Sequence, residues 1–107
     1  MSHFVEVAST EQLVAGTGAL VKLSNIAIAL FNVRGKIFAI DDTCVRCGSS
    51  LAAGSLRATE ITCSGCDWQY DVTTGRVNGI PALRTDTFEA KIVDTRVFLA
   101  TMSKSAV

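Results

Sequence analysis

The chain has 107 residues, of which 49% are apolar, and its ten basic and ten acidic side chains balance to a formal net charge of zero. This length is enough for one domain with a hydrophobic core, and we expect residues 1–107 to form a single domain. The balanced charge offers no basic surface, so we expect no nucleic-acid partner. No apolar run is long enough to cross a bilayer, so the sequence predicts no membrane segment.

The first forty residues are typical of short strands with turn signals between them. Strand composition is found at residues 3–8, 19–23, 26–33 and 36–40. The segment 26–33 is the most apolar, which predicts a buried strand. Ser9 and Gln12 bracket a helical turn in which Gln12 reaches back to the cap. Turns are expected at Ser24–Asn25 and Arg34–Gly35.

The rest of the chain adds strands around two loops that contain the cysteines. Strand composition is found at residues 60–63, 68–72, 88–93 and 97–101. We expect a turn at Thr73–Arg76, a rigid loop at Gly79–Ala82 around the only proline, and a frayed tail at Met102–Val107. The pattern predicts an all-β sandwich or barrel, with a small metal-binding lobe at about residues 42–82.

The strongest chemical signal is the spacing of the cysteines. All four occur as two C-x-x-C pairs, Cys44–Cys47 and Cys63–Cys66, with fifteen residues between the pairs. A tight turn in such a pair aims both sulfurs at one ion, and two pairs at this separation are typical of metal sites. A tetrahedral shell of four thiolates suits zinc or iron. We therefore predict that Cys44, Cys47, Cys63 and Cys66 are the metal ligands.

Two disulfides are the main alternative use of four cysteines. The N-terminal residues MSHFVEVAST lack the basic region and apolar run of a signal peptide, so we expect a cytoplasmic protein with reduced thiols. A redox motif of the thioredoxin type is also disfavoured, because such a motif occurs once and beside a βαβ pattern, which this chain lacks.

Over nearly its full length, the sequence resembles the Rieske-type ferredoxin family. The matching segments are Gly35–Cys44, Cys47–Gly54, Ile61–Cys63, Trp68–Val77 and Gly79–Ala82. The resemblance implies a Rieske-like antiparallel β sandwich with a cluster-binding lobe, and an electron carrier in place of an enzyme. It also implies redox protein partners, namely a reductase and the terminal oxygenase of a ring-hydroxylating dioxygenase, with the proline loop covering the cluster.

The ligand positions depart from the family pattern, which is C-x-H in the first cysteine loop and C-x-x-H in the second. Arg46 stands at the first histidine position and Cys66 at the second, and the only histidine of the chain is His3. A Rieske centre needs two histidine ligands, so this chain cannot supply one by itself. Cys47 follows the lost histidine position and creates C-x-x-C-G, which resembles a rubredoxin knuckle.

Three hypotheses follow for the centre. In the preferred one, the four cysteines bind a single ion, either iron, which carries one electron, or zinc, which is redox-silent. In the second, the same residues hold an all-cysteine [2Fe–2S] cluster, whose potential lies below the Rieske range because thiolates add negative charge. In the third, the chain is a zinc-stabilised module that binds a protein without redox chemistry. We expect an electron-transfer protein that is a monomer.

Side chains near the cysteines have less specific roles. Arg46 is either a charge that partly offsets an anionic centre or a solvated loop residue. Core positions are expected for the aromatic residues Phe31, Phe38, Trp68, Tyr70, Phe88 and Phe98. The carboxylates of Asp41, Asp42 and Asp67 flank the loops and are expected to bond local N–H groups as turn residues.

Overall fold

The computed structural model describes residues 3–14, 16–23 and 25–103. Its strands are β1 Phe4–Ser9, β2 Gly18–Leu23, β3 Ile26–Val33, β4 Lys36–Asp41, β5 Ser55–Arg57, β6 Glu60–Thr62, β7 Gln69–Asp71, β8 Arg76–Val77, β9 Ile80–Arg84, β10 Thr87–Val93 and β11 Arg96–Ser103. Two short 3-10 helices, η1 Thr10–Gln12 and η2 Leu51–Ala53, complete the regular structure of the described residues, which contain no α-helix. The all-β prediction is confirmed.

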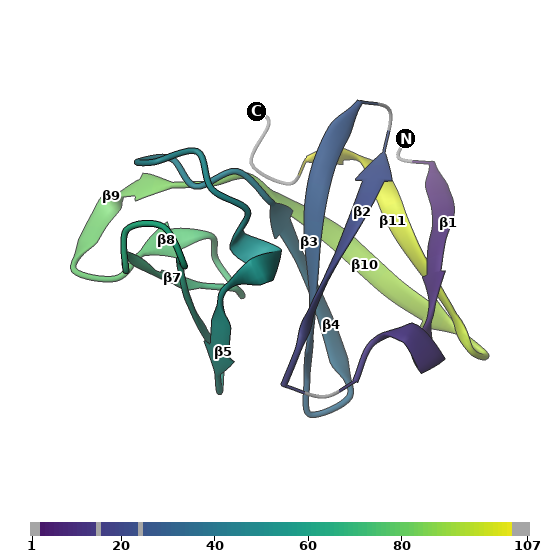
Figure 1. Ribbon diagram of the computed structural model, residues 1–107. Helices are drawn as coiled ribbons and strands as arrows, with labels where there is room; N and C mark the ends of the chain where they lie inside the picture. The colour runs from purple at the N-terminus through teal and green to yellow at the C-terminus, as the bar shows by residue number, and fades with distance from the viewer. Residues whose placement is uncertain (1–2, 15, 24, 104–107) are drawn as a thin grey trace.

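The two ends of the chain build one antiparallel sheet of six strands. Its strand order is β1-β11-β10-β4-β3-β2, so the two C-terminal strands, β10 and β11, lie between β1 and the β4-β3-β2 meander. The sheet curls until its two outer strands, β1 and β2, approach each other (Figure 1). The curled sheet forms the framework on which the rest of the chain is mounted.

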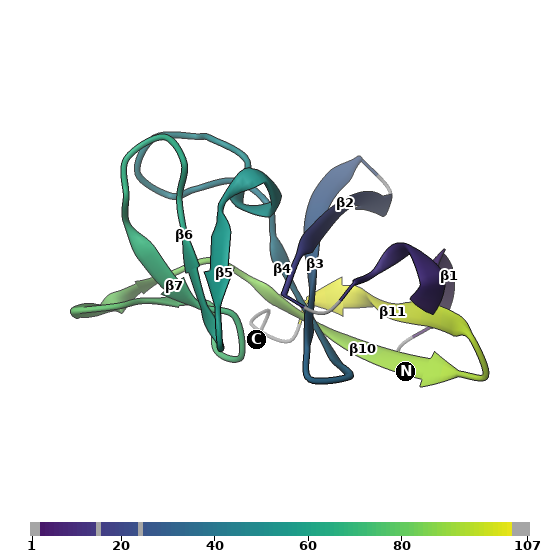
Figure 2. The same cartoon turned by 60° about the horizontal axis from the view of Figure 1, so that its bottom comes forward.

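The middle of the chain forms a second, smaller sheet. Strands β5 to β9 follow one another in sequence order as an antiparallel meander of five strands. Figures 1 and 2 show this sheet beside the framework, with the segment between β4 and β5 leading into it. This is the lobe expected at about residues 42–82, and its last strand runs to Arg84.

Strand β3 explains how the two sheets are held together. Side chains alternate between the faces of a strand. Ile28 and Leu30 point into a core enclosed by the curled framework, whereas Ala29 and Phe31 point into a core shared with the lobe. All four are fully buried, which accounts for the unbroken apolar run in this strand.

The lobe core contains cysteine residues as well as ordinary apolar side chains. Its buried members are Ala29, Phe31, Ile40, Cys44, Leu51, Ile61, Cys63, Tyr70, Val72 and Val77. One cysteine of each C-x-x-C pair is therefore part of the hydrophobic core. Packing against β3 and β4 fixes the position of both cysteine loops relative to the framework.

Some local expectations need correction. The segment Gly79–Ala82 is not a rigid loop: Pro81 lies in β9, an edge strand, where its missing N–H costs no ladder hydrogen bond. The short strands β5 and β8 lie in segments where no strand was expected. The tail expected from Met102 is wrong for its first two residues, because β11 runs to Ser103. Residues 104–107 and Ser24 lie outside the described residues.

Several other local predictions are confirmed. Strand β3 has the expected bounds, and Gln12 Oε1 accepts a hydrogen bond from the Ser9 backbone N–H at 2.8 Å, as the capping pattern indicates. Asn25 has a φ of 75°, which agrees with a tight turn between β2 and β3. Of the six aromatic residues, Trp68, Phe38 and Phe98 are only partly buried.

Candidate metal centre

The first cysteine loop, Cys44–Gly48, is a tight turn closed by backbone hydrogen bonds. The N–H of Gly48 donates to the carbonyl of Cys44 at 3.0 Å, and the N–H of Cys44 donates to the carbonyl of Ser49 at 2.9 Å. Gly48 has a φ of 79°, a conformation that glycine adopts without steric cost. The turn holds Cys44 and Cys47 on the same side.

The second cysteine loop, Cys63–Asp67, repeats this geometry. The N–H of Asp67 donates to the carbonyl of Cys63 at 3.0 Å, and the N–H of Cys63 donates to the carbonyl of Trp68 at 2.8 Å. Asp67 has a φ of 65° at the position that Gly48 occupies in the first loop. Aspartate tolerates this conformation better than most residues, so the second loop forms the same turn without glycine.

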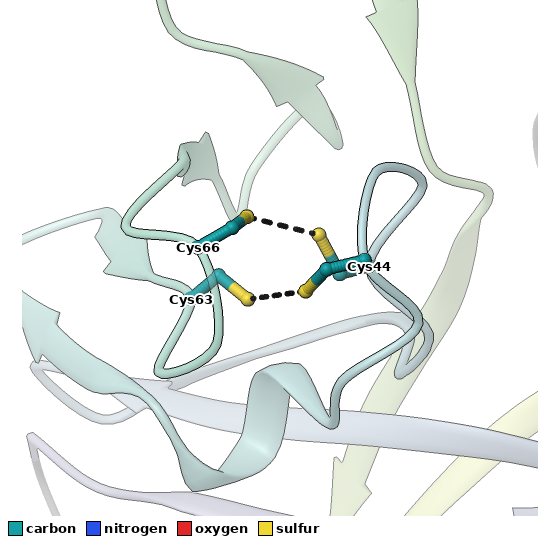
Figure 3. Close-up of side chains that lie close together, drawn as sticks. Cys44, Cys63 and Cys66 are labelled. Atoms are coloured by element: carbon teal, nitrogen blue, oxygen red, sulfur yellow. Dashed lines mark hydrogen bonds between the residues drawn. The ribbon is translucent and has the colours of Figure 1, made fainter.

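The two loops face each other and bring all four sulfurs together. The four Sγ atoms lie within 4.8 Å of one another. Two close contacts cross between the loops: Cys44 Sγ and Cys66 Sγ are 3.8 Å apart, and Cys47 Sγ and Cys63 Sγ are 3.5 Å apart. Figure 3 shows Cys44 on one loop facing Cys63 and Cys66 on the other. The cysteines singled out by their spacing are therefore one cluster.

The cluster has a buried side and an exposed side. The first cysteine of each loop is buried, with an exposed fraction of 2% for Cys44 and 0% for Cys63. The second cysteine of each loop is more accessible: Cys47 is exposed and Cys66 is half-buried. The outer edge of the cluster is therefore open to solvent or to a docking protein, while the inner edge is anchored in the lobe core.

Gly65 permits the close approach of the two loops. A Cβ atom at this position would lie 2.3 Å from Ser49 Oγ and 3.0 Å from Cys47 Sγ, both on the first loop or just after it. The backbone N–H of Gly65 also points at Cys63 Sγ at 3.4 Å. The absence of a side chain at Gly65 therefore leaves room for the Cys47 sulfur of the first loop. The backbone N–H of Gly65 approaches the Cys63 sulfur of the second loop.

Tyr70 joins the hydrophobic core to the cluster. Its ring is fully buried, and its hydroxyl lies 3.1 Å from Cys44 Sγ while accepting a hydrogen bond from the Val45 N–H at 3.0 Å. The core position predicted from the sequence is confirmed, but this polar contact was missed. A buried tyrosine hydroxyl usually has a hydrogen-bond partner, so the predicted burial of Tyr70 already indicated that its hydroxyl would contact a polar group.

Asp42 organises the approach to the first loop. It is buried, and its Oδ1 accepts hydrogen bonds from Ser50 Oγ at 3.0 Å and from the Ala52 N–H at 2.8 Å. Its backbone carbonyl accepts the N–H of Leu51 at 2.7 Å. These bonds tie the chain before Cys44 to the chain after Cys47, so the carboxylate closes the base of the loop, as expected for a turn residue.

Arg46 lies at the tip of the first loop and spans to the second. Its guanidinium carbon is 5.2 Å from the centre of the Trp68 ring, within the range of a cation–π contact. Its positive charge is thereby kept close to both loops. Of the two roles considered for this residue, the contact favours a charge placed beside the cluster.

The thiols differ in their tendency to ionise. Burial raises the pKa of the Cys44 thiol, but hydrogen bonds from the Tyr70 hydroxyl and from N–H groups of the first loop outweigh burial and lower that pKa to about 6. The N–H of Trp68 lowers the pKa of Cys66, yet burial and the three neighbouring thiols raise it to about 12. Like charges this close disfavour one another, so four thiolates require a cation among them.

The comparisons with known proteins place the chain in a family. It belongs to the Rieske domain family, because the model described as "Rieske [2Fe-2S] domain" matches residues 3–101. A similar curated protein is the ferredoxin component of the naphthalene 1,2-dioxygenase/salicylate 5-hydroxylase systems of Ralstonia sp.. It is 30% identical over 98 residues, which cover 91% of this chain and 94% of that protein.

Further relatives have the same description. The ferredoxin component of the p-cumate 2,3-dioxygenase system of Pseudomonas putida is 34% identical over 83 residues, covering 76% of this chain and 70% of that protein. These relatives are ferredoxin components of dioxygenase systems, which are electron carriers rather than enzymes, as predicted. The recognised resemblance is therefore confirmed at the level of the family.

Solved structures confirm the fold. The ferredoxin of carbazole 1,9a-dioxygenase from Nocardioides aromaticivorans superposes with a TM-score of 0.86 at 22% identity, over 92% of this chain and 98% of that one. A ferredoxin from Sphingomonas yanoikuyae gives a TM-score of 0.83 at 23% identity, over 92% and 98% of the two chains. Separately, across the residues that the structure describes, no helix has the length and apolar character needed to cross a membrane.

Proposed function

We propose that this chain is a one-electron carrier whose centre is a single iron ion bound by Cys44, Cys47, Cys63 and Cys66. The observation that carries the proposal is the cluster of four Sγ atoms within 4.8 Å of one another. Iron bound there would supply a ferric/ferrous couple. The chain's own contribution is to hold four thiolates on two loops of matching geometry and to shield one side of them from water.

The sulfur separations favour one ion. A tetrahedral ion with metal–sulfur bonds of about 2.3 Å places its ligand sulfurs about 3.8 Å apart. Two of the cross-loop separations, 3.5 Å and 3.8 Å, agree with this edge length. In a two-iron cluster, sulfurs bound to different irons would lie further apart than sulfurs bound to the same ion. Such a cluster would require the loops to move apart.

Two alternatives share the same ligands. The family model is described as a [2Fe–2S] domain, which favours an all-cysteine two-iron cluster on this scaffold. Zinc is the second alternative, because a closed shell of four thiolates suits a structural zinc ion, and a zinc-loaded chain would be a non-redox binding module. The only histidine, His3, is exposed and lies in the N-terminal segment, outside the cysteine cluster. Both alternatives therefore use the same four cysteine ligands.

We further propose that the chain serves a redox system like those of its relatives, receiving an electron from a reductase and passing it to a terminal oxygenase. The support is the family membership together with the accessible outer edge of the cluster at Cys47 and Cys66. An exposed ligand edge lets a docked protein approach the centre closely. A cytoplasmic monomer remains our expectation for this role.

Voltammetry tests the redox proposal directly. Iron-loaded protein is expected to give one reversible one-electron wave, and zinc-loaded protein is expected to give none, because zinc has no accessible couple. The zinc form is the matched control, since it shares the scaffold and the ligands. An iron-loaded protein that is electrochemically silent would remove the basis for electron transfer.

Replacing Tyr70 with phenylalanine is expected to lower the potential of the iron form. The hydroxyl contact to Cys44 Sγ stabilises negative charge on sulfur, which is greater in the reduced state. We expect a shift of roughly 50 mV, which corresponds to about 1 kcal/mol for one electron. Thr73→Val is the control, because it removes a hydroxyl whose bond to Asp71 lies away from the sulfurs. Equal potentials in wild type and Y70F would show that this contact does not tune the centre.

A further inference from the structure

Within the cluster of four sulfurs, two close contacts each span the two loops. Cys47 Sγ lies 3.5 Å from Cys63 Sγ, and Cys44 Sγ lies 3.8 Å from Cys66 Sγ. Each pair joins an accessible thiol to a buried one, since Cys47 is exposed and Cys66 half-buried while Cys63 and Cys44 are buried. An accessible cysteine beside a second thiol is the arrangement in which oxidation of the first ends in a disulfide with the second.

We infer that the cluster is also a peroxide-oxidisable dithiol site, which closes as two cross-loop disulfides, Cys47–Cys63 and Cys44–Cys66. This chemistry goes beyond the proposed electron carrier, because it uses the sulfurs themselves as the electron donors and does not depend on which metal they bind. The side chains need only small rotations, since sulfurs at 3.5 Å and 3.8 Å must close to a bond of about 2.05 Å.

The oxidation can be written as a balanced sequence with hydrogen peroxide. The Cys47 thiolate attacks one peroxide oxygen, the O–O bond breaks, and a sulfenic acid and hydroxide form. The Cys63 thiolate then attacks the Cys47 sulfur, the S–S bond forms and a second hydroxide leaves. Solvent protons convert both hydroxides to water, so two electrons pass from the sulfurs to one peroxide. A second peroxide reacts in the same way at Cys66, with Cys44 as the resolving thiol.

The consequence of oxidation is release of the bound metal. The thiolate, and not the disulfide sulfur, is the metal ligand, so each disulfide removes two ligands from the shell. The products join the same two loops that the metal joins, so the lobe stays cross-linked. A dithiol reductant restores the four thiols. Oxidation would thus convert the metal-bound site into a metal-free site in which two disulfides join the loops.

The disulfide connectivity of the full-length wild-type protein tests the inference. Trypsin cleaves after Arg46 and Arg57, so Cys44 and Cys47 fall in different peptides, while Cys63 and Cys66 share a third. Cross-loop disulfides hold all three peptides together, whereas disulfides within each C-x-x-C pair join only the first two. Fragmentation of the third peptide at Ser64–Gly65 then assigns which cysteine is bound to which.

The purified, metal-loaded protein is treated with hydrogen peroxide, and released metal and peptides are measured together. We expect loss of the metal with Cys47–Cys63 and Cys44–Cys66 as the dominant pairs. Within-loop pairs, the alternative cross-loop pairs, or sulfinic acids in place of disulfides would overturn the inference. The same oxidation in guanidinium chloride is the control, because an unfolded chain favours the short within-loop closures. Metal and sulfide assayed before oxidation show separately whether the proposed centre is correct.

Discussion

Replacing Cys63 with serine is expected to abolish tight metal binding and to unfold the lobe. Cys63 is completely buried, belongs to the lobe core and lies 3.5 Å from Cys47 Sγ. The binding free energy of a structural four-ligand ion is about 10–16 kcal/mol in small zinc domains, and it is coupled to folding. Removing one of four thiolates should therefore reduce metal per chain to a small fraction of the wild-type value and lower the melting temperature.

Ser64→Ala is the matched control for this variant. Ser64 is the neighbouring exposed residue of the same loop, and its change removes no sulfur. It should keep wild-type metal content and stability. The measurement is metal per chain after gel filtration, with thermal unfolding of the same samples. A Cys63→Ser protein that keeps its metal with wild-type affinity would exclude Cys63 from the ligand set and with it the four-cysteine centre.

Replacing Gly54 with alanine is expected to destabilise the protein strongly without touching a ligand. A Cβ at this position would lie 2.1 Å from the carbonyl oxygen of Thr62, in β6, and 3.3 Å from that of Leu51. The obstructing atoms are backbone, so relief requires β6 to move away from η2 and carry Cys63 with it. Overpacking of this kind costs about 1–3 kcal/mol or more, and we expect the upper end of the range.

Urea unfolding of the metal-loaded protein measures this cost. Ser55→Ala is the control, because Ser55 is the adjacent exposed residue, and exposed substitutions usually change stability by about 0.5 kcal/mol or less. Since the displacement reaches Cys63, metal affinity should fall together with the free energy of unfolding. Wild-type stability in G54A would show that η2 and β6 are not packed as closely as the structure indicates.

The cysteine cluster could be predicted from the sequence because each C-x-x-C turn is determined by residues that are close in the chain. Each C-x-x-C pair is a short turn whose geometry is decided within a few residues, and the structure closes both turns with the same backbone hydrogen bonds. The long strands could also be predicted, since alternation and continuous apolar runs persist over many residues. Strand β3, buried on both faces, is the clearest case.

What could not be predicted depends on contacts between distant residues. Strand β8 has only two residues, too few for any periodic pattern, and β9 forms only because β8 lies beside it. The hydroxyl of Tyr70 reaches a sulfur 26 positions earlier in the chain, so no local pattern indicates it. The sequence does not fix the number of ions, because the two C-x-x-C turns favour one ion whereas the Rieske scaffold favours two irons. The cross-loop sulfur separations of 3.5 Å and 3.8 Å support the single ion that we propose.

Elemental analysis with an inorganic sulfide assay tests most directly whether the Rieske scaffold of this chain holds a mononuclear centre. Protein purified without added metal is measured for iron, zinc and sulfide per chain. We predict about one metal ion per chain and no inorganic sulfide, with iron as the functional ion. About two irons with a matching amount of sulfide would exclude a mononuclear centre and show that the four cysteines hold a binuclear cluster.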